Sequence, residues 1–218
     1  MSDEKRPYRM KRRAELEEQT RLRITESAVA LHEEIGPAQT SVSAIAERAG
    51  VRRSTVYRHF PDEEALFEAC SSHWRAANPP PDPSAWSSLA DPDERTRTAL
   101  RELYAFYRRT GPMYVSLLRD EPLVLPVRRR LRDFHAYLRS IADGLAAGRG
   151  LRGRRSASVR AALGHAVAFP TWHSLTHDQG LDDDAAVELM CRLVECAGLS
   201  RSAPRPRQPQ RSPLGDRR

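Results

Sequence analysis

The stretch from Thr40 to Phe60 constrains the fold of this chain more than any other part of the sequence. It predicts two short helices joined by a tight turn, because Ser41 can accept hydrogen bonds from free amides at a helix start and Gly50 readily adopts a left-handed turn conformation. Val56 and Phe60 are four positions apart, so they would share the buried face of the second helix.

The other side chains of the second helix can form hydrogen bonds, and none of them is acidic: Arg53, Ser54, Thr55, Tyr57, Arg58 and His59. A short helix with apolar anchors on one side and such groups on the other fits the major groove of duplex DNA, where they can meet base edges and phosphates. We therefore interpret the stretch as a helix-turn-helix whose recognition helix begins near Arg53.

Composition limits the class of protein. The 218 residues include 36 Lys+Arg against 29 Asp+Glu, a balance that suits a polyanionic partner. The 3 cysteines, Cys70, Cys191 and Cys196, form no CxxC pair, so neither a disulfide framework nor a four-ligand zinc site is predicted. No apolar run approaches the roughly 18 residues of a membrane helix. We expect a cytoplasmic protein.

The rest of the chain predicts an all-α fold, because strand-like alternation is absent and apolar residues recur at spacings of three and four. Beyond the Pro-rich break at 78–83, helices are expected at 93–109, 112–119, 126–147, 156–177 with a kink at Pro170, and 182–197. The expected organisation is a flexible basic arm at 1–19, a DNA-binding domain at 20–78, a helical domain at 84–200 and a disordered tail at 201–218.

The arm carries a basic cluster between Lys5 and Arg13. Two interpretations remain open at this point. The cluster could lie along DNA phosphates or in a minor groove, or it could be a solvated tail.

Three motifs give the N-terminal part a family resemblance: SAIAERAGV at 43–51, STVYRHF at 54–60 and PDEEAL at 61–66. In this order and spacing they resemble the TetR family of bacterial transcriptional regulators. The resemblance implies an all-helical homodimer whose first three helices bind DNA. It also implies that the remaining helices bind a small-molecule effector and form the dimer.

Carried over by position, the resemblance assigns phosphate contacts to Ser41 and Tyr57 and a further backbone contact to His59. The complete set of expected DNA contacts is Ser41, Ser43, Arg52, Arg53, Ser54, Thr55, Tyr57, Arg58 and His59. The sequence departs from the family pattern at three positions: Glu63 replaces a usual lysine, Ser43 a frequent arginine, and His32 a frequent buried phenylalanine.

The helical domain is rich in aromatic residues that could line a cavity for a mostly apolar effector, with a few polar groups to orient it. The candidates are Trp86, Tyr104, Tyr107, Met113, Phe134, Tyr137, Phe169, Trp172 and His173. The same spacing is equally typical of residues that only fill a core.

Two stripes near the end of the chain are candidates for a dimer interface or for the core of the monomer. They comprise Val159, Leu163, Ala166 and Val167 on one helix, and Ala186, Leu189, Met190, Leu193 and Ala197 on the last.

Histidines four positions apart can share a metal ion, which makes His173, His177 and Asp178 a conceivable site, but no HExxH glutamate accompanies them. No nucleophile and base pair, P-loop or paired catalytic carboxylate is evident, so no metal, cofactor or enzymatic activity is expected. The prediction is a DNA-binding repressor that leaves a palindromic operator when a small molecule binds. The alternative is an all-helical enzyme or metal-binding protein with an incidental helix-turn-helix.

Overall fold

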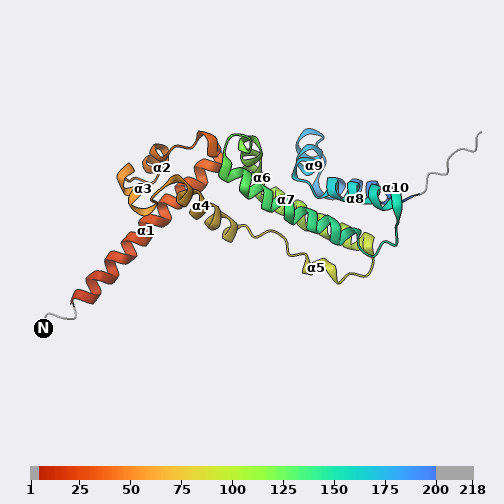
Figure 1. Cartoon of the computed structure of the whole chain (residues 1–218), viewed down its shortest axis with the longest axis horizontal. Coiled ribbons are helices and arrows are strands. Elements are labelled where there is room, and N and C mark those ends of the chain that lie inside the picture. The colour runs from red at the N-terminus through yellow and green to blue at the C-terminus, as the bar shows by residue number, and fades with distance from the viewer. Residues whose placement is uncertain (1–4, 200–218) are drawn as a thin grey trace, which may run out of the picture.

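The computed structural model describes residues 5–199, in which all regular structure is helical (Figure 1). The predicted all-α fold is therefore confirmed. In chain order the elements are α1 (Lys5–Glu34), η1 (Pro37–Gln39), α2 (Val42–Arg48), α3 (Arg53–His59), α4 (Glu63–Ala77), α5 (Ser84–Ser87), α6 (Pro92–Asp120), α7 (Leu125–Ala146), α8 (Gly153–Ala166), α9 (Phe169–His173), η2 (Ser174–Asp178) and α10 (Asp183–Gly198). The tail expected at 201–218 lies outside the described residues.

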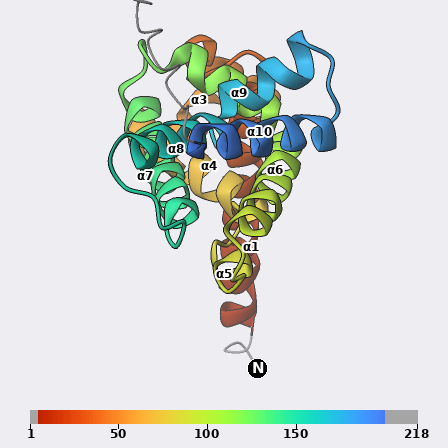
Figure 2. The ribbon, with the colours of Figure 1, turned by 90° about the vertical axis from the view of Figure 1, so that its right-hand side faces the viewer.

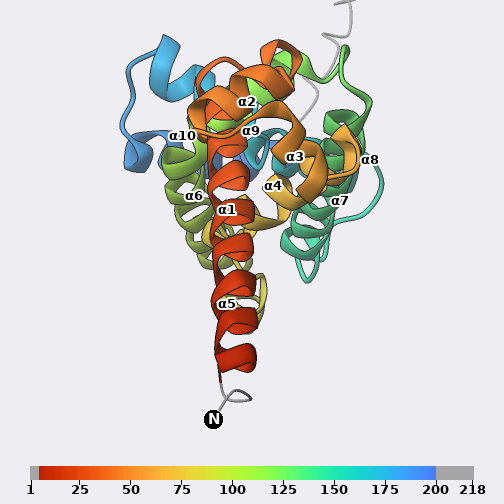
Figure 3. The same cartoon turned by 90° about the vertical axis from the view of Figure 1, so that its left-hand side faces the viewer.

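Helices α1 to α4 form a small bundle at one end of the molecule (Figures 1 and 3). The Ser41 hydroxyl oxygen accepts a hydrogen bond from the Ala44 amide at 3.1 Å and begins α2, and Gly50 turns the chain toward α3 with a φ of 65°. The helix-turn-helix is thus present, on a core that contains Ile24, Ala28, Val42, Ile45, Ala46, Val56, Phe60, Leu66 and Cys70.

The expected flexible arm is helical in its described part. Helix α1 begins at Lys5 and continues without a break to Glu34, and its first turns project beyond α2, α3 and α4 (Figures 1 and 3). Pro7 lies in the first turn, where a missing amide hydrogen costs no helical hydrogen bond. Further along, Arg13 and Glu17 form an exposed ion pair at 3.2 Å. Local sequence features therefore do little to end the helix in this stretch. Its side chains at 10–19 are exposed and add no tertiary packing.

The second half of the molecule is built on α6 and α7, two long helices that pack side by side (Figure 1). The sequence pattern predicts two helices, 93–109 and 112–119, where the structure has the single helix α6, so the predicted break at 110–111 is wrong. Proline inside a helix costs about 3 kcal/mol. The helix continues because its sides are buried against α1, α7, α9 and α10 along most of its length.

Helices α8 and α10 pack together at the end of the molecule opposite α1 (Figures 1 and 2). The single helix expected at 156–177 is instead interrupted at Val167 and Ala168. At the break, the hydroxyls of Tyr104 and Tyr107 donate hydrogen bonds to the carbonyls of Ala166 at 2.9 Å and Val167 at 2.6 Å. These bonds satisfy backbone groups that the interrupted helix would otherwise leave unpaired.

Pro170 was expected to kink a continuous helix, but it lies in the first turn of the separate helix α9, a position that proline favours. The chain then continues through a π-helical turn, η2, before α10. None of the helices within residues 5–199 combines the length and hydrophobicity needed to cross a membrane.

Candidate functional site

Helix α3 presents the polar face that the sequence predicts. Arg53, Ser54, Tyr57 and Arg58 are exposed, as is Arg52 directly before the helix. Ser41 and Ser43 are exposed at the start of α2, and Thr55 is half-buried. The structure therefore brings these candidates together on the surface of the helix-turn-helix.

Arg53 and Tyr57 form a connected pair on this face. The Arg53 guanidinium donates a hydrogen bond to the Tyr57 hydroxyl at 3.1 Å and lies 5.5 Å from the centroid of the Tyr57 ring. This hydrogen bond raises the pKa of Arg53. The tyrosine therefore restricts the position of the arginine while leaving it on the exposed side of α3.

His59 differs from the other candidates. Its Nε2 atom is enclosed and has no hydrogen-bond partner among the described residues, so this nitrogen is not available to a phosphate at the surface. Burial lowers the pKa of His59, and the neighbouring Arg58 and Arg21 lower it further. Arg21, which is not among the residues predicted from the sequence, donates to the His59 carbonyl at 2.9 Å and stacks on Phe60 at 4.3 Å, fixing the end of α3 on α1.

A second candidate site is a cavity of about 260 Å³ where the α1 to α4 bundle meets α6 and α7. Its walls are mostly apolar and include rings from α4, α6 and α7. The lining residues are Val29, His32, Phe67, Cys70, Ser71, Trp74, Arg75, Asn78, Pro80, Phe106, Met113, Tyr114, Leu117, Arg130, Leu131, Asp133, Phe134 and Tyr137. The cavity therefore borders the helix-turn-helix support and the second half of the molecule at once.

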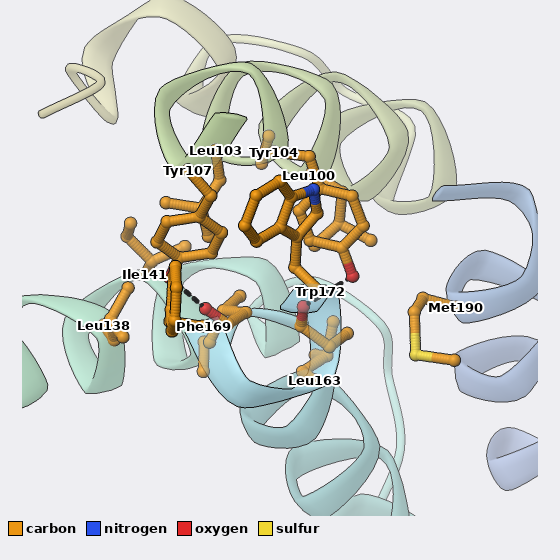
Figure 4. Packing of buried hydrophobic residues seen from close by; sticks show 14 of the residues in the cluster. Leu100, Leu103, Tyr104, Tyr107, Leu138, Ile141, Leu163, Phe169, Trp172 and Met190 are labelled. Carbon is orange, nitrogen blue, oxygen red and sulfur yellow. Dashed lines mark hydrogen bonds between the residues drawn. The ribbon is translucent and has the colours of Figure 1, made fainter. Parts of the chain in front are cut away.

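The structure divides the predicted effector residues. Met113, Phe134 and Tyr137 line the cavity. Tyr104, Tyr107 and Trp172 instead fill solid core between α6, α7 and α9, where the rings of Tyr107 and Trp172 lie 5.7 Å apart (Figure 4). The remaining three also lie outside the cavity lining: Trp86 is buried on α5, Phe169 borders a smaller hollow beside Phe134, and His173 stacks on His177.

Several lining residues were missed in the sequence. Phe67, Ser71, Trp74 and Asn78 all face the cavity from α4 and its end. Their spacing of three and four residues is a second helical stripe, beside the stripe of Leu66 and Cys70 that enters the bundle core. That stripe was the signal available in the sequence.

His32 connects the cavity to the core of the bundle. Its Nδ1 lies 3.6 Å from the sulfur of Cys70, and its ring packs 5.7 Å from that of Phe67. Burial lowers the pKa of His32 to about 4, although nearby Asp120 opposes the shift. His32 is therefore neutral at physiological pH.

Hydrogen bonds join the end of α6 to the end of α1 and to the segment that follows it. Ser116 donates to the Glu33 carbonyl at 3.2 Å, Arg119 donates to the Ile35 carbonyl at 2.7 Å, and the Asp120 carboxylate accepts from the Ala38 amide at 2.9 Å. We call these three contacts the α6 latch. Gly36 has a φ of 89°, and a Cβ there would lie only 1.9 Å from an Arg119 nitrogen, so glycine permits the close approach.

Two ion pairs join α4 to α7 near the cavity. Arg129 pairs with Glu64 at 2.8 Å, and Arg130 pairs with Glu68. Glu63, the departure from the family pattern, lies exposed in the first turn of α4, which Asp62 caps through the Ala65 amide at 2.7 Å. A carboxylate at this helix end interacts favourably with the helix dipole.

The histidine pair does not assemble a metal site. The rings of His173 and His177 are parallel, with centroids 4.4 Å apart. Within residues 5–199, no group of three or more His, Cys, Asp and Glu side chains is placed to hold an ion.

The predicted dimer stripes divide between core and surface. Ala186 and Met190 are buried within the chain's own core, as are Val159, Leu163, Ala166 and Val167, so for these residues the structure favours the second of the two alternatives, the core of the monomer. Leu189 and Leu193 are 37% and 41% exposed on α10, and Ala197 is half-buried. Small residues on α8 are exposed as well: Ala157, Ser158, Ala161 and Gly164.

Comparison with known proteins identifies the first part of the chain. Residues 24–70 match the profile of the bacterial regulatory proteins of the tetR family. This range contains α2, α3 and the whole of the polar face described above. A search of curated protein sequences found no match.

Solved structures share the fold over most of the chain. A putative TetR-family transcriptional regulator from Mesorhizobium loti is 19% identical, with a TM-score of 0.58 and coverage of 83% of this chain and 96% of that one. NalD, the secondary repressor of the MexAB-OprM multidrug efflux pump in Pseudomonas aeruginosa, is 21% identical, with a TM-score of 0.55 and coverage of 87% and 100%. The fatty acid degradation regulator FadR from Bacillus halodurans is 19% identical, with a TM-score of 0.52 and coverage of 80% and 93%.

Proposed function

We propose that this chain, which belongs to the TetR family of transcriptional regulators through residues 24–70, is a repressor that releases its operator when a small molecule occupies the cavity. The observation that carries the proposal is that the cavity is walled by α1 and α4, whose buried side chains share one core with those of α3, and by α6 and α7. A ligand there contacts both halves of the molecule.

In this proposal α3 enters the major groove of the operator. Arg53 and Arg58 reach base edges, where a bidentate arginine to guanine contributes about 1–3 kcal/mol of discrimination. Ser41 and Tyr57 contact phosphates, which set the register of the helix on the duplex. His59 supports the end of α3 from behind, because its Nε2 is enclosed.

The protein acts as a homodimer in this proposal, because one short recognition helix reads too few base pairs for useful selectivity. Leu189 and Leu193 of α10 supply the apolar contacts of the interface. The small exposed residues of α8 allow a close approach of the partner helices. A two-fold dimer places its recognition helices about 34–36 Å apart and requires an inverted repeat in the operator.

Switching follows from linkage between the two sites. The protein has one arrangement that binds DNA and one that does not. An effector that binds the second arrangement more tightly lowers operator affinity by the ratio of its affinities for the two. Bound operator lowers effector affinity by the same factor. Helix α6 can carry this coupling, because Met113, Tyr114 and Leu117 line the cavity while the α6 latch holds the end of α1. The efflux-pump repressor and the fatty acid regulator of similar fold are consistent with such a role.

The experiment is a fluorescence anisotropy titration of the purified protein with DNA from upstream of its own gene and with scrambled DNA of equal length. At two salt concentrations, specific binding should exceed scrambled binding by at least about a thousandfold, and both should weaken as salt rises. Equal affinity for both DNAs, or no binding to either, would contradict the proposal.

A further inference from the structure

The chemistry of the cavity walls restricts what the cavity can bind. Aromatic rings dominate: the rings of Tyr114 and Phe134 lie 4.6 Å apart, and Trp74 meets Tyr114 edge-on at 5.9 Å. Rings in these arrangements offer both faces and edges to a further aromatic group. A cavity of about 260 Å³ lies below the roughly 300–1,000 Å³ of most drug-sized ligand sites, so the occupant must be compact.

The charges around the cavity balance one another. Arg130 pairs with Glu68, and Arg75 lies 3.9 Å from the same carboxylate. Asp133, the one carboxylate among the lining residues, offsets the second arginine without forming an ion pair in the described part of the chain. His32 is neutral because burial lowers its pKa to about 4. The four charges sum to zero, so a charged ligand would lose its hydration without meeting a net opposite charge in the walls, and that loss is costly.

The Tyr114 hydroxyl is a polar group in the walls that lacks a partner. The hydroxyls of Tyr104, Tyr107 and Tyr137 donate to backbone carbonyls, in the case of Tyr137 to Pro81 at 2.5 Å. The Tyr114 hydroxyl has no hydrogen-bond partner among residues 5–199, although the residue is only 6% exposed. His59 Nε2 is the one fully enclosed unpaired side-chain atom in the described chain, so the Tyr114 oxygen keeps accessible surface. The residue lines both the cavity and the smaller hollow beside Phe169.

From these walls we infer that the cavity binds an uncharged, compact aromatic molecule whose carbonyl or other oxygen accepts a hydrogen bond from the Tyr114 hydroxyl. The inference rests on the proposed function, because it names the chemical class of the effector. Trp74 also lines the cavity, and its Nε1 has no hydrogen-bond partner among the described residues.

The test compares naphthalene derivatives of similar shape by isothermal titration calorimetry of the full chain without DNA. Acetylnaphthalene is neutral and carries an acceptor, ethylnaphthalene is neutral without one, naphthoate is an anion, and naphthyltrimethylammonium is a cation. The ketone should bind at least about tenfold more tightly than either ion, because the ions must be desolvated while the charges around the cavity offer no net counter-charge. An ion that binds more tightly than the ketone, or the failure of every compound to bind, would overturn the inference.

A variant isolates the hydroxyl. Tyr114→Phe keeps the ring and should weaken acetylnaphthalene about 3- to 10-fold, the effect of one hydrogen bond, while leaving ethylnaphthalene affinity as it is. In the matched variant Tyr137→Phe, the ratio of the two affinities should equal that of the wild type, because the deleted hydroxyl faced Pro81. Equal weakening of both ligands by Tyr114→Phe would overturn the role of the hydroxyl.

The outcome is separable from that of the DNA experiment. A chain that binds the ketone through Tyr114 but not specific DNA would keep the ligand class and lose the proposed function. A chain that binds specific DNA but prefers naphthoate would keep the proposed function and lose the ligand class.

Discussion

The carboxylate of Asp120, at the end of α6, accepts a hydrogen bond at 2.9 Å from the backbone amide of Ala38, which lies 82 positions earlier in the chain. Asp120 is 2% exposed and also accepts from Arg119 at 2.8 Å. The loop between α1 and α2 is therefore fixed directly to the helix that lines the cavity.

Replacing Asp120 with alanine should lower the free energy of unfolding by about 1–3 kcal/mol, because it removes charge-assisted hydrogen bonds at a buried site. Asp120→Asn, which keeps an acceptor oxygen, should lose less. The hydrogen bond from Arg119 holds the pKa of Asp120 below its usual value. Its stabilisation is therefore complete above about pH 4 and is lost as the pH falls further. Urea unfolding measures both effects; an alanine variant as stable as the wild type would show that the Asp120 contact of the α6 latch contributes nothing.

His32 should make the folded state sensitive to mild acid. The unfolded chain takes up a proton at this residue near pH 6.5, whereas burial keeps the folded residue neutral down to about pH 4. Stability should therefore fall as the pH drops from about 6.5 to 4. His32→Phe removes the group, so unfolding curves at several pH values should show a shallower decline for the variant. An unchanged decline would mean that other groups account for it.

Arg53 should determine operator selectivity. Arg53→Ala is expected to reduce the discrimination between operator and scrambled DNA by about 1–3 kcal/mol, because alanine cannot reach a base edge. Arg109→Ala, which removes an exposed arginine of α6, serves as the control for charge alone. Anisotropy titrations give both affinities, and equal losses on the two DNAs for Arg53→Ala would place the residue on phosphates instead.

The projecting part of α1 should add electrostatic affinity for DNA. Deleting residues 1–13 removes the basic cluster, so operator binding should weaken. The slope of log affinity against log salt should become shallower, by about 0.9 for each phosphate that the shortened chain no longer neutralises. The comparison uses the same operator at several salt concentrations. If the slope does not change, the projecting helix is a solvated extension.

The sequence predicted the parts of the molecule that local chemistry determines. The helix-turn-helix could be predicted from four residues with clear local roles. These are the helix start at Ser41, the turn at Gly50, and the buried face of the second helix at Val56 and Phe60. The helix boundaries predicted from Pro112 and Pro170 were wrong. Proline disfavours a helix interior locally, but tertiary burial and side-chain hydrogen bonds decided where these helices ended. In α6 and α8 those tertiary interactions came from partners distant in the chain.

The cavity could be predicted only in part for a related reason. Tyr107 and Phe134 are both aromatic residues at helical spacing, yet one fills core and the other lines the cavity. The difference depends on how closely α4, α6 and α7 approach, and spacing within one helix does not contain that information. The face of α4 around Trp74 was missed because its partners are on other helices.

The most direct test of the account is a footprint of the full chain on DNA from upstream of its own gene, combined with sedimentation. The protein should be a dimer that protects an inverted repeat with half-sites about one helical turn apart or a multiple of it. Leu189→Glu with Leu193→Glu should give folded monomers that no longer protect the site, because unpaired charge is placed in the interface. The milder Leu193→Ser replaces this pair if the double variant does not fold. Protection of a single asymmetric site by a monomer, or a double variant that remains dimeric and protects the repeat, would contradict the account.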